Sequence, residues 1–285
     1  MLYLSREQIS ALVERLGQPE ASILLKKFFN SYRRTLSSRD VAALYDDAYI
    51  NAINNHELYL EEPGKFRLNI YHRNAFEYIS KKLFHDARIL DIGCGSGDFA
   101  IALATRNVKE VVGIDFSRPS IEKAIQKSAA LSLPCKFICA DVATLSGEDV
   151  YDFVLLNDVS EHLSDAELIP LLKKIRHLLS PRGELLIHTP NGLAICNDTD
   201  TNLLQMLFKL YLRIVKKWRG TIRTPEQIYY DQVHINVKSF RQLKSLLFEC
   251  GFKAKVYYDD EAGKHGLLKM LSSNMLVVAK PRYVK

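Results

Sequence analysis

The spacing of apolar residues changes once along the chain, near residue 87. Over residues 1–86 they recur every three or four positions, as on one face of a helix. The first such run starts at Ile9, after Ser5 and Gln8, a pair that resembles a capping box. We therefore predict a helical N-terminal region. Its further helices are expected at about 20–35, 39–53 and 66–84, with Pro63-Gly64 as the breaker before the last one.

From residue 87 onward, short apolar runs alternate with amphipathic helical stretches. Strands are predicted at 88–92, 111–114, 136–140, 153–157, 184–189, 253–258 and 274–280. Helices are predicted at 97–106, 117–131, 165–179 and 237–250, with Gly251 at the cap of the last one. Strands alternating with helices in this way are typical of βαβ units. The expected fold class is therefore α/β, a doubly wound, seven-stranded sheet of the Rossmann-like kind.

The alternation is interrupted at about 192–232, where a long helix near 200–218 is predicted in place of a strand. We interpret this stretch as a helical lid inserted after the fifth strand. The expected domain organisation is thus a helical N-terminal cap region, 1–86, followed by an α/β domain, 87–285, that contains the insertion.

The composition is that of a globular protein, with 47% hydrophobic and 25% charged residues, and it excludes wholesale disorder. The five cysteines include no Cys-x-x-Cys pair, so we expect reduced thiols rather than a disulfide framework. The N-terminus lacks a signal-peptide pattern, and no apolar run approaches the ~20 residues of a membrane-spanning helix. These features favour a cytoplasmic protein.

The formal net charge of +6 is concentrated in one segment. Six cations and no acid lie between Thr201 and Pro225, where apolar residues recur at helical spacing. A lid helix with a solvated basic side explains this pattern. Contact with an anionic acceptor explains it too, as does peripheral contact of the basic helix 201–223 with an anionic membrane.

A glycine-rich turn carries the strongest local signal. The predicted strand 88–92 runs into Gly93, Gly95 and Gly97, which allow a sharp turn and close approach of a ligand. Asp115 ends the next strand, where a carboxylate can accept ribose hydroxyls. The spacing differs from the dinucleotide pattern Gly-x-Gly-x-x-Gly, and Asp91 suits a cationic amino group better than a pyrophosphate. A ligand with a ribose and an amino acid end is therefore favoured, which indicates a methyl donor.

The segment 88–99 resembles motif I of the class I S-adenosylmethionine-dependent methyltransferases, and four later landmarks follow in the family's order. They are 111–117, 137–142, 151–163 and 181–191. The stretch 234–252 resembles the branch that includes ubiquinone-type O-methyltransferases. The resemblance implies S-adenosyl-L-methionine as cofactor, with Asp115 on the ribose, Phe116 on the adenine ring and Asp141 near the adenine amino group. The implied cofactor-binding residues are Asp91, Gly93, Cys94, Gly95, Gly97, Asp115, Phe116, Asp141, Val142, Asn157 and Val159.

Three histidines are candidates for a general base, because a neutral imidazole has a suitable pKa near 6.5. His188 lies within the fifth strand, and we expect it to be a satisfied core residue. His162 also suits a structural role after the fourth strand, and His234 the anchoring of the insertion. We name His234 and His162, in that order, as catalytic candidates.

Metal-dependent catechol methylation would require a cluster of carboxylates and amides. Asp158 and Asn191 could contribute to one, but a single pair is not a site, so no metal is expected. The N-terminal region is rich in amphipathic rings that either cap the cofactor and face the acceptor or pack as ordinary core. These are Tyr45, Tyr49, His56, Tyr59, Tyr71 and His72.

The implied reaction is methyl transfer to oxygen or nitrogen of a small biosynthetic acceptor, such as a sugar, a quinone-like compound or a secondary metabolite. Alternatives are a glycan, lipid-linked or protein acceptor, or a cofactor-binding scaffold without catalysis, against which the intact turn argues. Nucleic acid is disfavoured, because Asn157 and Asp158 are not followed by the two prolines and aromatic residue that often accompany base amino-methylation. The sequence leaves the oligomeric state open.

Overall fold

The computed structural model describes residues 6–17, 21, 24–25, 60–62, 65–66, 72–141, 150–192, 234–258, 272 and 274–282. Several predicted features lie outside these ranges. They are most of the predicted helix 20–35, all of the predicted helix 39–53, nearly all of the insertion 192–232, the basic helix 201–223 and Val142. In the described part of the chain, no helix combines the length and the apolar character needed to cross a membrane.

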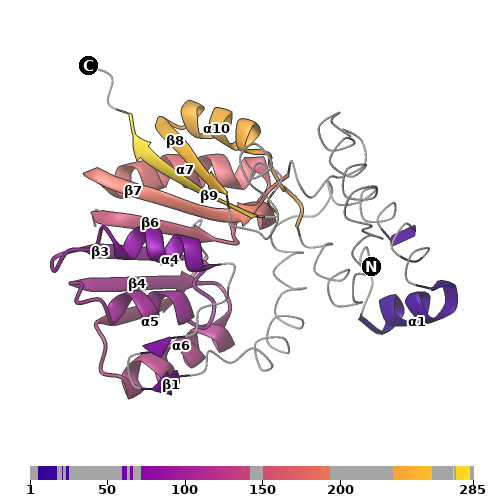
Figure 1. Ribbon diagram of the computed structural model, residues 1–285, viewed down its shortest axis with the longest axis horizontal. Coiled ribbons are helices and arrows are strands. Elements are labelled where there is room, and N and C mark those ends of the chain that lie inside the picture. Colours follow the sequence, from indigo (N-terminus) through magenta and orange to yellow (C-terminus); the bar gives the residue numbers. More distant parts are fainter. Residues whose placement is uncertain are drawn as a thin grey trace, which may run out of the picture.

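A seven-stranded sheet forms the centre of the molecule, in the order β5-β4-β3-β6-β7-β9-β8 (Figure 1). The strands are β3 (Arg88–Ile92), β4 (Glu110–Asp115), β5 (Cys135–Cys139), β6 (Tyr151–Asn157), β7 (Leu179–Pro190), β8 (Phe252–Tyr258) and β9 (Asn274–Pro281). Neighbouring strands are parallel except at β9, which is antiparallel to both β7 and β8. The predicted α/β sheet is confirmed.

The strand order reverses between β3 and β6. The chain leaves β3 toward β4 and β5 and then returns to the other side of β3 with β6. In open α/β sheets, ligands bind beyond the carboxyl ends of the strands at such a switch point. The glycine-rich turn after β3 lies at this position.

Helices cover both faces of the sheet (Figure 1). On one face lie α4 (Arg73–Ser80), α5 (Asp98–Ala104) and α6 (Arg118–Ala130), and on the other lie α7 (Asp165–Leu178) and α10 (Phe240–Glu249). Alternate strand residues supply the two halves of the core. Ile89 and Leu155 pack with α4 and α5, whereas Leu90 and Leu156 pack with α7 and α10.

Local signals set where these helices begin and end. The Ser239 hydroxyl caps α10 by accepting a hydrogen bond from the Gln242 backbone N–H at 3.4 Å, and Ser164 forms the equivalent capping box with Glu167 at α7. Gly251 follows α10 with φ +86°, as expected for a residue just past a helix end.

The N-terminal region departs from the prediction at two places. The short strands β1 (Leu60–Glu62) and β2 (Lys65–Phe66) pair before α4, so the predicted helix 66–84 is wrong at Phe66 and beyond Ser80. Among the described residues of that range, Arg73–Ser80 form the α-helix. The predicted strand 184–189 is longer in the structure. It forms part of β7, which begins at Leu179 because that residue pairs with Tyr151 across a register shift.

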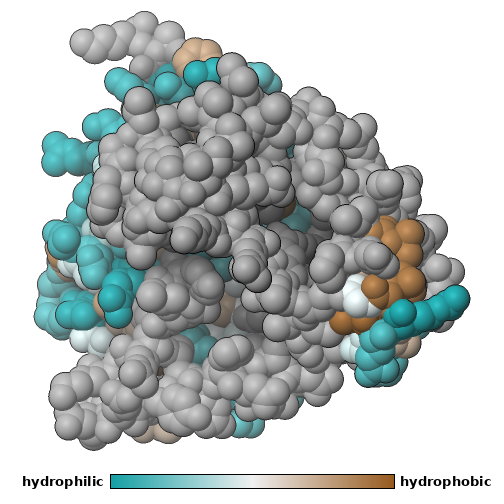
Figure 2. All heavy atoms as spheres, turned by 45° about the vertical axis from the view of Figure 1, so that its right-hand side comes forward, coloured by the Kyte–Doolittle hydropathy of each residue, from teal (hydrophilic) through white to brown (hydrophobic). Residues whose placement is uncertain are grey.

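The predicted first helix is present as α1 (Arg6–Leu16). Ile9 on this helix is fully buried, whereas Glu7 and Glu14 are exposed. Figure 2 shows the resulting separation at its right-hand side, where a brown apolar area adjoins teal polar side chains. The helical periodicity read from the sequence is therefore a correct guide at this end of the chain.

Candidate cofactor and active site

The glycine-rich turn is built on backbone conformations that favour glycine. Gly93 and Gly97 have φ +71° and +79°, and the Gly93 backbone N–H donates to the carbonyl of Ile114 at 2.7 Å. A Cβ on Gly97 would lie 2.8 Å from the Cβ of Ala124, and one on Gly93 would clash with the side chain of Val159. Glycine is thus required here for both conformation and space, and Val159 closes over the turn.

Asp115 connects this turn to β4. Its Oδ2 accepts a hydrogen bond from the Gly95 backbone N–H at 2.8 Å, and its Oδ1 accepts one from the Ser117 backbone N–H at 2.9 Å. These bonds fix the carboxylate in one orientation beside the glycine-rich turn. The adjacent Phe116 ring is 46% exposed, which is unusual for a large apolar side chain and leaves surface on which a planar ring can stack.

Asp91 lies beneath the turn and is 2% exposed. Burial, and then the nearby negative charge of Asp115, raise the pKa of its carboxyl to about 8. Burial likewise raises the pKa of the Cys94 thiol, and charge repulsion from Asp91 adds to this effect. Cys94 is therefore a packing residue of the turn rather than a nucleophile.

Two further predicted cofactor residues lie at neighbouring strand ends. Asp141 is exposed just after β5. Asn157, the last residue of β6, has its amide oxygen and nitrogen buried, and neither has a hydrogen-bond partner among the described residues. Buried polar atoms normally find partners, so this orphaned amide fits a site that a polar ligand completes.

A carboxylate joins two histidines directly after β6. Asp158, at φ +53°, has its Oδ1 2.7 Å from His188 Nδ1 and its Oδ2 2.8 Å from His72 Nε2. Burial alone would raise the pKa of the Asp158 carboxyl, but the charges and hydrogen bonds of both imidazoles outweigh burial and hold it well below its usual value. The two rings lie edge to face, with centroids 5.2 Å apart.

His72 is the member of this group that sequence analysis did not single out. It precedes α4, and its ring lies edge to face with that of Phe99 from α5, 6.0 Å between centroids. Its side chain is 25% exposed, whereas that of His188 is 1% exposed. The only sequence signal was its place among the N-terminal rings, because its partner Asp158 is 86 positions away.

The predicted bases His162 and His234 lie together in a second group. Their ring centroids are 5.0 Å apart, and Glu161 is beside them at 0% exposure. Glu161 and His162 belong to the 3₁₀ turn η4 (Ser160–His162), directly beyond β6. Burial, followed by repulsion from Asp158, raises the pKa of the Glu161 carboxyl to about 8. Asn191, by contrast, is fully buried and donates to the Ser272 carbonyl at 2.9 Å, so it has a structural role.

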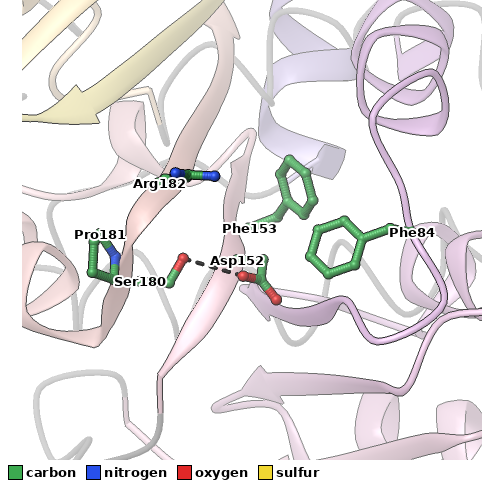
Figure 3. A pocket seen from close by; sticks show the side chains of 6 residues that line it. All are labelled: Phe84, Asp152, Phe153, Ser180, Pro181 and Arg182. Carbon is green, nitrogen blue, oxygen red and sulfur yellow. Dashed lines mark hydrogen bonds between the residues drawn. The ribbon is translucent and has the colours of Figure 1, made fainter.

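A cavity of about 460 Å³ opens at the opposite, amino edge of the sheet. Its lining residues are Phe84, Asp152, Phe153, Ser180, Pro181 and Arg182. Figure 3 shows the Ser180 hydroxyl pointing to Asp152, to which it donates a hydrogen bond of 3.1 Å. The other oxygen of Asp152 accepts a hydrogen bond from the Arg88 backbone N–H at 3.0 Å. This carboxylate therefore links the first residues of β3, β6 and β7. None of the predicted site residues lines this cavity.

The family model described as a methyltransferase domain matches residues 89–183. This range spans β3 to the first part of β7 and includes the glycine-rich turn, Asp115, Asp158 and Glu161. The strand order around the turn agrees with it. Residues 89–183 thus carry a methyltransferase domain, set in a sheet of the class I, S-adenosylmethionine-dependent kind. The resemblance of its motifs to this family, and the cofactor that the family uses, are confirmed.

Curated relatives of this methyltransferase include quinone-modifying enzymes. The demethylmenaquinone methyltransferase of Staphylococcus epidermidis is 28% identical over 179 residues, covering 58% of this chain and 68% of that protein. The protein of the same name from Staphylococcus aureus strain Newman is 28% identical over 174 residues, covering 58% and 67%.

Two solved structures illustrate the range of reactions on this fold. The Burkholderia thailandensis 1,6-didemethyltoxoflavin-N1-methyltransferase, bound to 1,6-didemethyltoxoflavin and S-adenosylhomocysteine, matches with a TM-score of 0.56, at 16% identity over 87% of this chain and 92% of that one. The [4+2]-cyclase SpnF matches with a TM-score of 0.58, at 18% identity over 87% and 98%. At these identities the likeness is one of fold, so the acceptor chemistry of this methyltransferase has to be argued from its own site.

Proposed function

We propose that this methyltransferase methylates a hydroxyl oxygen of a small acceptor. The observation that carries the proposal is the His72–Asp158–His188 group next to the glycine-rich turn. A hydroxyl keeps its proton at neutral pH, so its methylation benefits from a base beside the methyl donor, and an imidazole bonded to a carboxylate supplies one.

The residues around the turn fit the cofactor. When bound, S-adenosylmethionine supplies an electrophilic methyl group carried on a sulfonium sulfur. Asp115, fixed by two backbone N–H groups, would accept hydrogen bonds from the ribose hydroxyls, and the exposed Phe116 ring would pack on the adenine. Asp91 is placed for the cationic amino group, and the glycines let the backbone come close.

His72 is the residue of this group that can meet an acceptor, because His188 is buried. Its Nε2 is bonded to Asp158, which leaves Nδ1 as the atom that takes the proton. With the methyl donor bound, Nδ1 would accept the hydroxyl proton as the oxygen bonds to the methyl carbon and the bond from that carbon to sulfur breaks. Asp158 Oδ2, 2.8 Å from Nε2, holds the ring in position and places a negative charge beside it.

Two measurements test this function. Calorimetry is expected to show micromolar binding of S-adenosylmethionine that is lost in Asp115→Ala and kept in Asp86→Ala, a matched change at an exposed carboxylate. Incubation with fractionated metabolites should then release S-adenosylhomocysteine together with a product heavier by one methylene. If the wild-type chain does not bind the cofactor, the proposal fails.

The concentrated charge of the sequence favours a lipid-linked acceptor as the second candidate. Six cations and no acid between residues 201 and 225 suit attraction to an anionic surface. Flotation with vesicles containing anionic lipid, compared with neutral vesicles, decides this point. Equal flotation in both would leave the water-soluble acceptor as the proposal.

A further inference from the structure

We propose that Glu161, His162 and His234 bind one divalent first-row transition-metal ion. Each side chain offers one ligand atom, and the three atoms lie within 4.8 Å of one another. Two imidazoles and one carboxylate form a donor set that suits zinc, iron or cobalt, and three protein ligands leave coordination positions open.

The three ligands come from two segments that backbone and side-chain bonds hold together. The Asn236 backbone N–H donates to the Glu161 carbonyl at 2.8 Å, and its amide nitrogen donates to the Leu163 carbonyl at 2.7 Å. The same amide reaches Asp165 at 2.9 Å, so Asn236 fastens its segment to residues 161–165, which include the end of the η4 turn. The histidines are therefore brought together by the fold before any ion binds.

Hydrogen bonds orient the Glu161 carboxylate through one of its two oxygens only, among the described residues. Its Oε2 accepts hydrogen bonds from the hydroxyls of Thr189 at 3.0 Å and Ser160 at 3.4 Å. Its Oε1 is buried and has no hydrogen-bond partner in the described ranges of the chain. A buried, unpartnered carboxylate oxygen is costly unless something else satisfies it, and a cation held with two imidazoles does so.

A second group also brings three ligand atoms within 4.8 Å of one another. It consists of His72, Asp158 and His188. In that group both carboxylate oxygens already accept hydrogen bonds, at 2.7 and 2.8 Å, from the two histidines. An ion would have to displace these bonds, whereas at Glu161 it fills a vacant acceptor. The geometry therefore favours a metal at Glu161 and a hydrogen-bonded chain at Asp158.

The location suggests what the ion does, and this part rests on the methyl-transfer function proposed above. The η4 turn lies directly beyond β6, at the carboxyl edge that also carries the glycine-rich turn. Open coordination positions at this edge can take an acceptor oxygen, orient it and favour its deprotonated form. The expected substrate class is thus a small molecule with a hydroxyl beside a second oxygen, which together chelate the ion.

Cobalt(II) is a suitable probe, because its visible absorption depends on the ligands around it. The untagged chain, first treated with a chelator and dialysed, is titrated with CoCl₂ and followed by absorption. We expect one equivalent to bind with a ligand-field spectrum of low coordination number. Glu161→Gln and His234→Ala are expected to weaken binding at least about tenfold, and His85→Ala, at a histidine whose side chain is 76% exposed, should have no effect. Circular dichroism of each variant shows whether it is folded.

The outcomes separate this proposal from the proposed function. Absence of stoichiometric cobalt binding by the folded wild-type chain overturns the metal site, as does binding that His72→Ala abolishes and His234→Ala retains. Calorimetry with S-adenosylmethionine on the same samples reports the methyl-donor site independently. Cobalt binding without cofactor binding would overturn the methyltransferase role and leave the metal site standing.

Discussion

At the scale of single residues, the proposed site depends on positions where an added carbon atom changes stability or a lost proton changes ligand binding. Gly97 combines a positive φ with close neighbours on two sides, the side chains of Ala124 and Phe137. Asp91 combines nearly complete burial with a position under the turn. The sequence marked both residues, but the reason that Gly97 must be glycine lies in α6 and β5, which no local pattern shows.

We expect Gly97→Ala to be more destabilising than Gly17→Ala. The two glycines have nearly the same φ, +79° and +77°, but a Cβ on Gly17 would meet nothing within 4 Å. Both changes carry the strain of a left-handed backbone, about 1 kcal/mol, and Gly97→Ala adds a clash of about 1–3 kcal/mol. Urea denaturation of both variants measures the difference. Equal losses of stability would show that α6 and Phe137 move aside without cost.

A second residue-scale prediction concerns the proton on Asp91. With a pKa near 8, its carboxyl is protonated at neutral pH in the free protein, and a cationic ligand favours the ionised form. Binding therefore releases a proton below about pH 8, and affinity for S-adenosylmethionine should rise with pH between about 6 and 7, where most of the ligand's own amino group is charged.

Calorimetry in two buffers of different ionisation enthalpy measures this proton release. Asp91→Asn cannot ionise and serves as the control, so its binding should be weaker and nearly independent of pH. Proton uptake by the wild-type chain, or the same pH dependence in the variant, would contradict the assignment of the proton to Asp91.

At the scale of elements, α4 links the N-terminal region to the site. Its start is held by the hydrogen bond of His72 to Asp158. Near its end, Tyr78 donates to the buried Glu184 of β7 at 3.0 Å, and Lys82, just beyond the helix, donates to the same carboxylate at 2.6 Å. Sequence periodicity predicted a helix here but extended it over β2. It missed the hairpin because strands of two or three residues leave no periodic signal, and it missed the role of His72 because the partner lies in a distant strand.

We expect His72→Ala to lower kcat by about 10²–10⁴-fold, because the acceptor proton then has no base beside it. The dissociation constant of S-adenosylmethionine should stay the same, since His72 contacts Asp158 and two rings rather than the residues around the cofactor. His85→Ala, at an exposed histidine beyond α4, is the matched control. A loss of cofactor affinity with unchanged kcat would make His72 a structural support of the turn instead.

At the scale of the whole molecule, the seven strands and their order were foreseeable, because each strand is a local apolar run and right-handed crossovers leave few topologies. The pairing of Glu161 and His162 with His234 was not, since the chain between them runs through the insertion. The proposed cofactor residues are likewise distributed, on β3, on β4 and at the end of β6, on both sides of the switch point. A ligand bound as proposed would therefore bridge the parts of the sheet on either side of β3.

This arrangement predicts that S-adenosylmethionine stabilises the domain as a unit. A ligand that binds only the folded state adds about 2.7 kcal/mol at one hundred times its dissociation constant, which corresponds to a rise in Tm of roughly 5–10 °C for a domain of this size. Differential scanning calorimetry should show one transition that moves upward with the logarithm of ligand concentration. Asp115→Ala should abolish the shift, and Asp86→Ala should keep it. Because the bound ligand would contact both halves of the sheet, a split transition with only one part stabilised would contradict a site at the switch point.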